Sequence, residues 1–455
     1  MRRLFKPPIR VAGTLTFPCR LRISSFVHTL AAIAFVLSLL VGAPCAALAE
    51  SHEMSAEARA VFDQAKDKLV QIRVLHKATG AQRSIGSGFL ASADGLVLTN
   101  YHVVSDAALE PGTYELELQR SGGTNVRPRL LAVDVANDLA VLSTGASGQP
   151  FLAIRATPLE KGDRGFALGH PLQLGMAIVE GTYNGHAEAT VVPRIHFTGA
   201  LNPGMSGGPA IAPDGKVFGI NVSHLWLQQL VSFLVPAEAA ADLLRRASVS
   251  GAPPADFRQE VGAQLLAQQA RLFERLLAEP VTTSVMGRYT VPDASSAYIR
   301  CWGTAQDDPE KLYGRDVKRC YLNGLTYVDD ALQMGELSFV HAVFESRGLG
   351  ALRFASLMED RYSTPYAGQF VTSRKALTGF RCHDDFVSRP GGTLRVTLCS
   401  RAYKSFAGLY DFHLRALTVD SDSSALLTTV TVSGVSFENG VRFARRHLEA
   451  ISWTN

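Results

Sequence analysis

Ser206 stands in a glycine-rich stretch that suits a nucleophilic loop. Residues 201–211 read LNPGMSGGPAI, with three glycines close to the serine. Glycine has no Cβ, so the backbone can adopt unusual conformations and nothing crowds the serine hydroxyl. Backbone N–H groups along Gly204, Met205 and Ser206 are therefore a candidate oxyanion hole, with those of Gly204 and Ser206 best placed to converge beside the hydroxyl. Because an unaided serine is a weak nucleophile, this chemistry also needs a base and a group that orients the base.

Two upstream residues are candidates for these roles. His102 lies in the run LTNYHVV, where we expect the end of a buried strand, and Asp138 precedes the apolar run LAVL. A carboxylate at the mouth of a buried strand needs a partner, and a histidine N–H is a good one. Each residue also has an ordinary explanation. A histidine among apolar residues is more often structural than catalytic, and Asp138 could be a turn aspartate, although Asp134 fits that role better.

Four short motifs around these residues resemble those of a known family. The segments GSGF, LTNYHVV, NDLAVL and NPGMSGGP, at residues 86–89, 98–104, 137–142 and 202–209, closely resemble the trypsin-like serine peptidases. The bacterial HtrA (Deg) branch is the most similar, since ALGHP at 167–171 and GIN at 219–221 also match it. The resemblance covers about residues 60–245, and the motifs occur in the family's order.

The resemblance implies a role for each candidate. Ser206 would attack the scissile carbonyl, and His102 would accept the hydroxyl proton and then give it to the leaving amine. Asp138 would hold the imidazole tautomer and stabilise the imidazolium. Many relatives carry Asn, Asp or Gln where this chain has Met205, but a backbone oxyanion hole does not require a polar side chain there. The substrates would be proteins or peptides.

The specificity residues indicate an apolar pocket. In trypsin-like enzymes that cut after Lys or Arg, an aspartate lies six residues before the nucleophile, whereas this chain has Ala200, followed by Leu201. Burying a basic side chain without a carboxylate is costly, so we expect small or aliphatic P1 residues. Asn221, Val222 and Ser223 are expected to form a strand edge along which a substrate adds by main-chain hydrogen bonds.

The strand pattern that must position these residues predicts a mainly β protein. Many short strands with Gly, Pro and Asp-Gly turns, and no helix between them, favour antiparallel barrels. We expect a double β-barrel protease domain over 50–247, then a linker with an amphipathic helix over 248–280. Its apolar stripe favours intramolecular packing over an oligomer seam. An α+β domain without a recognisable PDZ-type carboxylate-binding loop should complete the chain over 281–455. Its candidate strands include 337–344, 352–357, 369–373, 393–400 and 426–435, before a helix near 439–451.

The N-terminal 49 residues have the features of a secretory signal peptide. They contain six basic and no acidic residues, then an apolar run from Leu30 to Ala43 and small residues before Glu50. We therefore expect export to the periplasm or the extracellular space, with membrane attachment only if this segment stays uncleaved. The whole chain has 45 basic and 41 acidic residues. Removal of the leader takes away six basic residues, which leaves 39 basic against 41 acidic residues and a net charge of −2. This balance gives no support for nucleic-acid binding.

All four cysteines beyond the leader lie near the C-terminus. An even number in an exported protein predicts two disulfides, and Cys301–Cys320 with Cys382–Cys399 is the favoured one of three pairings. Metal binding is the weaker interpretation, because no CxxC unit is present and His383 stands alone beside Cys382. We expect no cofactor and no metal. The sequence predicts no oligomeric state. A catalytically silent protease fold whose C-terminal domain is a binding module remains the alternative to an active peptidase.

Overall fold

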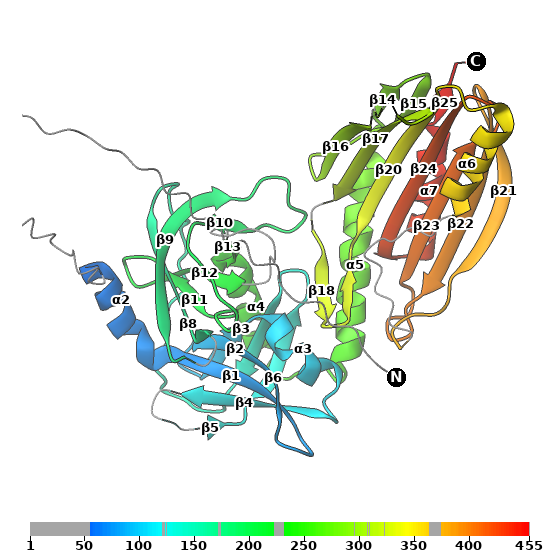
Figure 1. The fold of residues 1–455 in the computed structure, drawn as a ribbon. Coiled ribbons are helices and arrows are strands. Elements are labelled where there is room, and N and C mark those ends of the chain that lie inside the picture. Colours follow the sequence, from blue (N-terminus) through cyan, green and yellow to red (C-terminus); the bar gives the residue numbers. More distant parts are fainter. Residues whose placement is uncertain are drawn as a thin grey trace, which may run out of the picture. The chain divides into compact units, whose positions relative to one another are not determined.

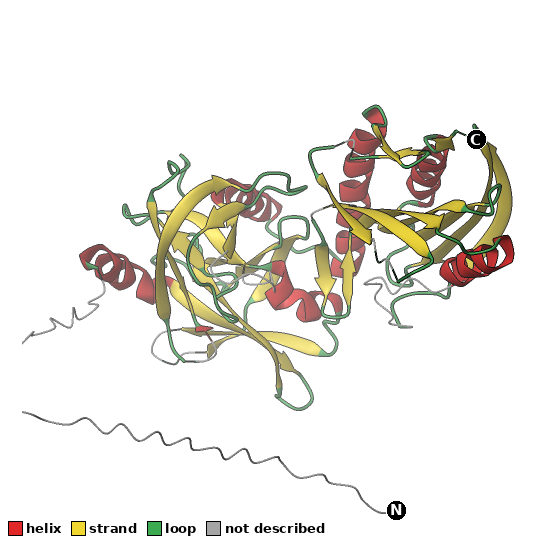
Figure 2. Ribbon diagram, turned by 45° about the horizontal axis from the view of Figure 1, so that its top comes forward, coloured by secondary structure: helices red, strands yellow, loops and turns green. Residues whose placement is uncertain are grey.

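A computed structural model describes residues 55–454 apart from 121–122, 124, 172–173, 223–231, 295, 307, 309, 323 and 364–374. These residues belong to one unit, Met54–Asn455, in which strands outweigh helices (Figures 1 and 2). The signal peptide expected over 1–49 lies outside the described residues. None of the helices in the described part is long and apolar enough to cross a membrane.

The first sheet has seven antiparallel strands in the order β5-β4-β1-β2-β3-β7-β6. Along β1, Val70, Ile72 and Val74 are buried at every second position, the spacing of a strand with one face on a core. Strands β2 and β3 form a hairpin, with Gly95 in the left-handed region at φ 74°. The strands are β1 Leu69–His76, β2 Gln82–Leu90, β3 Leu96–Thr99, β4 Tyr114–Arg120, β5 Asn125–Val126, β6 Arg129–Asp134 and β7 Leu139–Ser143.

The second sheet closes into a barrel in the order β10-β13-β12-β11-β8-β9. The expected pair of barrels is therefore one closed barrel and one open sheet of seven strands. The strands are β8 Arg164–Gly169, β9 Ala177–His186, β10 Ile195–Phe197, β11 Pro209–Ile211, β12 Val217–Val222 and β13 Ser232–Pro236.

Helix α3 (Tyr101–Leu109) corrects the expected environment of His102. Strand β3 ends at Thr99, and His102 lies in the first turn of α3 rather than at the end of a strand. Tyr101, Val104 and Ala108 are buried at helical spacing, so the apolar run after Asn100 satisfies a helix better than a strand. The other helices of this half are α2 Ala56–Ala65, the 3₁₀ turn η1 Lys66–Lys68 and α4 Ala237–Ser250.

The C-terminal part is α+β, as predicted. Its main sheet is antiparallel in the order β16-β17-β20-β24-β23-β22-β21. The strands of this part are β14 Thr283–Met286, β15 Tyr289–Pro292, β16 Ile299–Gln306, β17 Tyr313–Leu322, β18 Thr326–Asp329, β19 Leu332–Met334, β20 Leu337–Ser346, β21 Arg381–Arg389, β22 Gly392–Ala402, β23 Tyr410–Thr418, β24 Ser424–Val435 and β25 Ser452–Trp453. The helices are α6 Ala351–Ser363 and α7 Phe437–Glu449.

Two details of this part bear on the sequence predictions. The strand expected over 352–357 is wrong, because these residues belong to α6, which buries Phe354, Met358 and Tyr362 at helical spacing. The strand expected over 369–373 lies outside the described residues. Both favoured disulfides are present, Cys301–Cys320 across the β16–β17 pair and Cys382–Cys399 across the β21–β22 pair.

Helix α5 (Phe257–Ala278) connects two cores. Asp256 begins it, accepting hydrogen bonds from the backbone N–H groups of Arg258 and Gln259. Val261 and Leu265 belong to the apolar cluster under the first sheet. Phe273 and Leu276 belong to the cluster under the C-terminal sheet. The predicted intramolecular packing of this helix is confirmed.

Candidate active site

His102 and Asp138 are in direct contact. The imidazole Nδ1 lies 2.7 Å from Asp138 Oδ2, and only about a tenth of each side chain is exposed. Because a carboxylate can only accept, Nδ1 carries the proton and donates it. In a neutral imidazole with this tautomer, the second ring nitrogen, Nε2, has the lone pair that a general base needs.

Asp138 also fixes the helix that carries the histidine. Its Oδ1 accepts a hydrogen bond of 2.9 Å from the backbone N–H of His102, so the carboxylate caps the N-terminus of α3 from another loop. The Asn100 side chain donates to the Asp138 carbonyl oxygen at 2.8 Å. Asp138 adopts φ 61°, a left-handed conformation that is uncommon for a residue other than glycine. These bonds hold the backbone in that conformation and aim the carboxylate at His102.

Asp134 has the ordinary turn role that the sequence suggested for it. Its Oδ1 accepts from the Asn137 backbone N–H at 3.0 Å, and its Oδ2 from the Asn137 side chain at 3.0 Å. Arg246 contacts the same carboxylate at 3.0 Å. The two aspartates therefore have different roles: Asp134 stabilises the turn, and Asp138 contacts His102.

The Ser206 loop is pressed against the segment that precedes His102. A Cβ added at Gly207 would lie only 2.3 Å from Thr99 Oγ1 and 2.9 Å from the backbone nitrogen of Asn100. A Cβ at Gly208 would lie 2.1 Å from the Leu168 carbonyl oxygen. Only glycine fits at either position, so the glycines after Ser206 permit the close approach of the serine and histidine segments.

Ser87, on β2, ties these segments together. It is fully buried, its N–H donates to the Ser206 carbonyl at 2.8 Å, and its hydroxyl donates to the Gly204 carbonyl at 2.7 Å. Its own carbonyl accepts from the Thr99 hydroxyl at 2.8 Å, and its hydroxyl accepts from the His170 N–H at 2.8 Å. One serine thus fixes both sides of the nucleophile loop relative to the end of β3. The motif GSGF contained Ser87, but its spacing did not reveal this role.

The loop backbone narrows the choice of oxyanion-hole donors. The N–H of Met205 donates to the Asn202 carbonyl at 3.0 Å within the loop, so it does not point at a substrate. Gly204 has φ 94° and Ser206 is 3% exposed. The candidate donors are therefore Gly204 and Ser206. The Met205 side chain is fully buried in the core of the second barrel, which explains an apolar residue at this position.

The candidate specificity residues have differing surroundings. Ala200 is exposed and Leu201 is partly buried against the core of the barrel, with its N–H donating to Ser232 Oγ at 3.3 Å. Asn221 is not at a free strand edge as expected. Its N–H donates to the Gly208 carbonyl and its carbonyl accepts from the Gly207 N–H, so the nucleophile loop occupies one side of Asn221. Leu234 of β13 is its strand partner on the other side. Val222 ends β12, and Ser223 lies outside the described residues.

Asn221 instead supports the nucleophile loop. Its buried side-chain amide donates to the Leu168 carbonyl at 2.9 Å and lies 3.4 Å from the Met205 carbonyl. With the two backbone bonds to Gly207 and Gly208, this gives the loop contacts on the side opposite Ser87. The residue is a scaffold for Ser206 rather than a surface for the substrate.

Comparison with known proteins agrees with this geometry. Residues 86–220 match the family model of the trypsin-like peptidase domain. Curated relatives include a probable periplasmic serine endoprotease DegP-like of Pseudomonas fulva, 32% identical over 184 residues, which are 38% of this chain and 37% of that protein. A putative serine protease HhoB of Synechocystis is 31% identical over 179 residues, 37% of this chain and 42% of the relative.

A solved serine endoprotease from Yersinia pestis is also similar. It is 25% identical, with a TM-score of 0.38, covering 44% of this chain and 70% of that one. The chain thus contains a trypsin-like serine peptidase domain, and the matched segment spans 37 to 42% of the two curated relatives.

Proposed function

We propose that this protein is an exported serine endopeptidase that hydrolyses peptide bonds of protein substrates with His102, Asp138 and Ser206. The observation that carries the proposal is the contact between His102 Nδ1 and Asp138 Oδ2, made beside a buried, glycine-lined serine loop. Export is supported by the leader, by the two disulfides and by the periplasmic relatives.

The proposed reaction has two halves. Ser206 Oγ bonds to the scissile carbonyl carbon while its proton passes to His102 Nε2, and the N–H groups of Gly204 and Ser206 stabilise the oxyanion. The C–N bond then breaks, and His102 returns the proton to the leaving amine. Water hydrolyses the resulting ester by the same route, with His102 as base. Asp138 stabilises the imidazolium in both halves.

The proposed P1 preference is for small or aliphatic residues. It rests on Ala200 and Leu201, which stand six and five residues before Ser206. Neither has a carboxylate that could pair with a basic P1 side chain. A peptide library digested by the purified protein would show the preference directly. Cleavage mainly after Arg or Lys would contradict it.

The decisive experiment for the activity is labelling with a fluorophosphonate probe. The protein from residue 50 onward should react, Ser206→Ala should not, and Ser147→Ala, which alters an exposed serine, should react like wild type. Such probes bond only to activated serines, so loss of the base should matter as much as loss of the nucleophile. A folded wild-type protein that stays unlabelled, or a Ser206→Ala protein that still labels, would overturn the proposal and favour a silent scaffold.

A further inference from the structure

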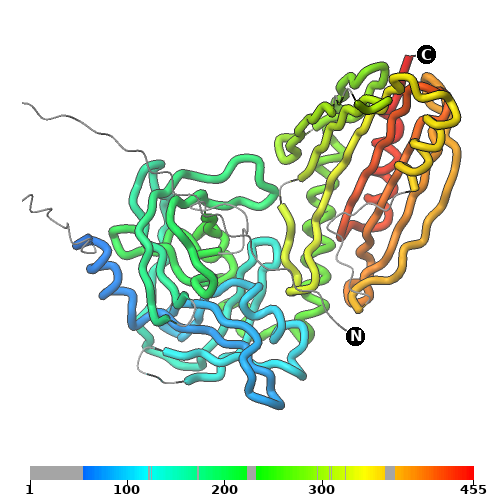
Figure 3. Tube along the Cα trace, in the orientation of Figure 1, coloured from blue at the N-terminus to red at the C-terminus, as the bar shows by residue number. Residues whose placement is uncertain are grey.

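The helix that carries His102 is covered by a hairpin from the C-terminal part of the chain. Strands β18 and β19 form this hairpin, and β18 contacts α3 (Figures 1 and 3). The fully buried Tyr101, next to His102, donates its hydroxyl proton to the Val328 carbonyl at 3.0 Å. Val328, Leu332 and Met334 belong to the same apolar cluster as Tyr101. The hairpin therefore completes the core on which α3 rests.

Ion pairs hold the tip of the hairpin. Arg83, on β2, lies 3.0 Å from Asp106 on α3 and 2.7 Å from Asp330 at the hairpin turn. Asp330 also accepts a hydrogen bond of 2.8 Å from the Tyr327 hydroxyl. Tyr327 is thus connected through Asp330 and Arg83 to Asp106, which lies one turn after His102 in α3.

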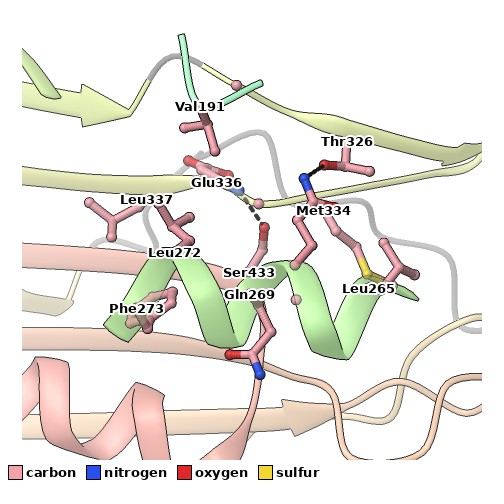
Figure 4. A pocket seen from close by; sticks show the side chains of 14 residues that line it. Val191, Leu265, Gln269, Leu272, Phe273, Thr326, Met334, Glu336, Leu337 and Ser433 are labelled. Carbon is pink, nitrogen blue, oxygen red and sulfur yellow. Dashed lines mark hydrogen bonds between the residues drawn. The ribbon is translucent and has the colours of Figure 1, made fainter. Parts of the chain in front are cut away.

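The base of the hairpin is anchored in the C-terminal part. Figure 4 shows a pocket between α5, the hairpin and β24, with two hydrogen bonds at its rim. Gln268 of α5 donates to Thr326 Oγ1 at 3.1 Å. The Glu336 N–H donates to Ser433 Oγ at 2.9 Å, joining the chain after the hairpin to β24. These contacts fix where the hairpin leaves the C-terminal sheet.

Tyr327 is held directly beside the imidazole. The two ring centroids are 5.8 Å apart and the ring planes meet at 71°, an edge-on contact. Aromatic rings attract one another in this arrangement, and the contact restricts rotation of both. Asp138 fixes the Nδ1 edge of His102, and the Tyr327 contact limits how far the ring can turn about that hydrogen bond.

We propose that Tyr327, supplied by the C-terminal part, is a positioning residue for His102. The inference rests on the proposed peptidase function. A histidine that exchanges a proton with both Ser206 and the leaving group must keep Nε2 in place through two transfers. Small misplacements of a catalytic group can reduce the rate about a hundredfold. The C-terminal part therefore contributes to catalysis through the ring of Tyr327, not only through whatever it binds.

A second contact from the C-terminal part supports the segment that carries Asp138, the partner of His102. Gln264, on α5, accepts from the Val135 N–H at 2.9 Å and donates to the Val133 carbonyl at 2.9 Å. These residues precede the turn that presents Asp138. The chain beyond residue 256 thus supports both the histidine and the aspartate segments.

The test compares Tyr327→Ala with Tyr327→Phe in the protein from residue 50 onward. Removal of the ring should lower kcat for a fluorogenic peptide with an aliphatic P1 residue about tenfold or more, with KM changed less than about twofold. Tyr327→Phe keeps the ring and should retain at least about a third of wild-type kcat. Tyr321→Ala, which removes a tyrosine 44% exposed on β17, is the matched control and should leave kcat unchanged.

A spectroscopic readout separates this proposal from the peptidase proposal. The low-field proton resonance of the His102–Asp138 hydrogen bond should be sharp in wild type and in Tyr327→Phe, and should broaden in Tyr327→Ala. Equal kcat values in Tyr327→Ala and wild type would overturn the role of Tyr327. If the wild type proves inactive, a resonance in Tyr327→Ala as sharp as in wild type would overturn it as well. An inactive wild type whose resonance still depends on Tyr327 would overturn only the peptidase proposal. Thermal unfolding of each variant checks that the fold survives.

Discussion

Buried histidines in the two halves of the described chain have opposite surroundings. His102 contacts a carboxylate, which can stabilise the imidazolium formed during a reaction. His341, on β20, is completely buried between Thr428 Oγ1 at 2.9 Å and the Pro292 carbonyl at 3.0 Å, and its ring stacks on His447 of α7 at 5.3 Å. Burial lowers the pKa of His341 to about 3 and, with His341 as neighbour, lowers the pKa of His447 well below its usual value. Burial alone does not make a histidine catalytic, because its partner decides whether it can take up a proton.

The largest expected effect is a loss of stability of the C-terminal part in mild acid. Unfolded histidine titrates near pH 6.5, whereas His341 and His447 stay neutral when folded, so their contribution is present above pH 6.5 and is lost as the pH falls towards about 3. At pH 5 the loss is about 2 kcal/mol per histidine. Urea unfolding between pH 7.5 and 5 would measure it.

A matched variant isolates the histidine contribution from that of nearby carboxyls. His447→Phe keeps a ring against Phe339 and Phe443 but has no site for a proton. Lys318 and Asp293 are the charged groups that influence His341, and both remain in this variant. The variant should lose the contribution of His447 to the pH dependence, about 2 kcal/mol at pH 5, while His341 and the partly buried His413 keep theirs. An equally steep dependence in wild type and variant would show that the histidine pair does not limit acid stability.

The next effect tests the covalent difference between the two halves. Both disulfides lie in the C-terminal sheet and close loops of 19 and 17 residues, while no cysteine occurs between residues 50 and 300. Loops of this length predict about 3 kcal/mol of stabilisation from each disulfide. A Cys301→Ser, Cys320→Ser double variant should unfold at lower temperature, and reductant should lower the wild-type midpoint further than that of the variant. Identical midpoints with and without reductant would contradict this expectation.

The smallest effect tests whether the two halves share a core. Tyr101→Phe removes the donor to the Val328 carbonyl and leaves that buried acceptor without its partner. The expected loss is about 1–2 kcal/mol of unfolding free energy. Calorimetry of the variant beside Tyr321→Phe, which alters an exposed tyrosine, would measure it. Equal midpoints in the two variants would mean that the hydrogen bond across the halves contributes nothing.

The peptidase half was largely predictable from the sequence because its chemistry imposes local constraints. The glycines after Ser206 are required by contacts below 3 Å, and such requirements leave a recognisable motif. The open first sheet, helix α3 and the bonds of Asn221 were not predicted. In α3 a run of apolar residues fits either a strand or a helix, and only the packing of Tyr101, Val104 and Ala108 decides between them.

The C-terminal half was predictable in class and cysteine pairing, but its role was not. No sequence signal marks Tyr327, since its contact with His102 joins residues far apart in the chain. The expected end of the protease domain at residue 247 stays a prediction. The apolar cluster under the first sheet nevertheless includes Val261 of α5, Val328 of the hairpin and Tyr403, all beyond that residue. A core can be continuous where the sequence motifs stop.

The bond between Tyr101 and Val328 also has a kinetic consequence. It joins residues 227 positions apart, and contacts of such long range form late because a large loop must close first. As the chain is synthesised, the helix of His102 emerges long before the hairpin that covers it. Until the hairpin arrives, Tyr101 and Val104 lack part of their apolar cover. The half that carries His102 therefore reaches its final structure only after most of the chain has been made, so the proposed active site would be complete only when the whole fold is complete.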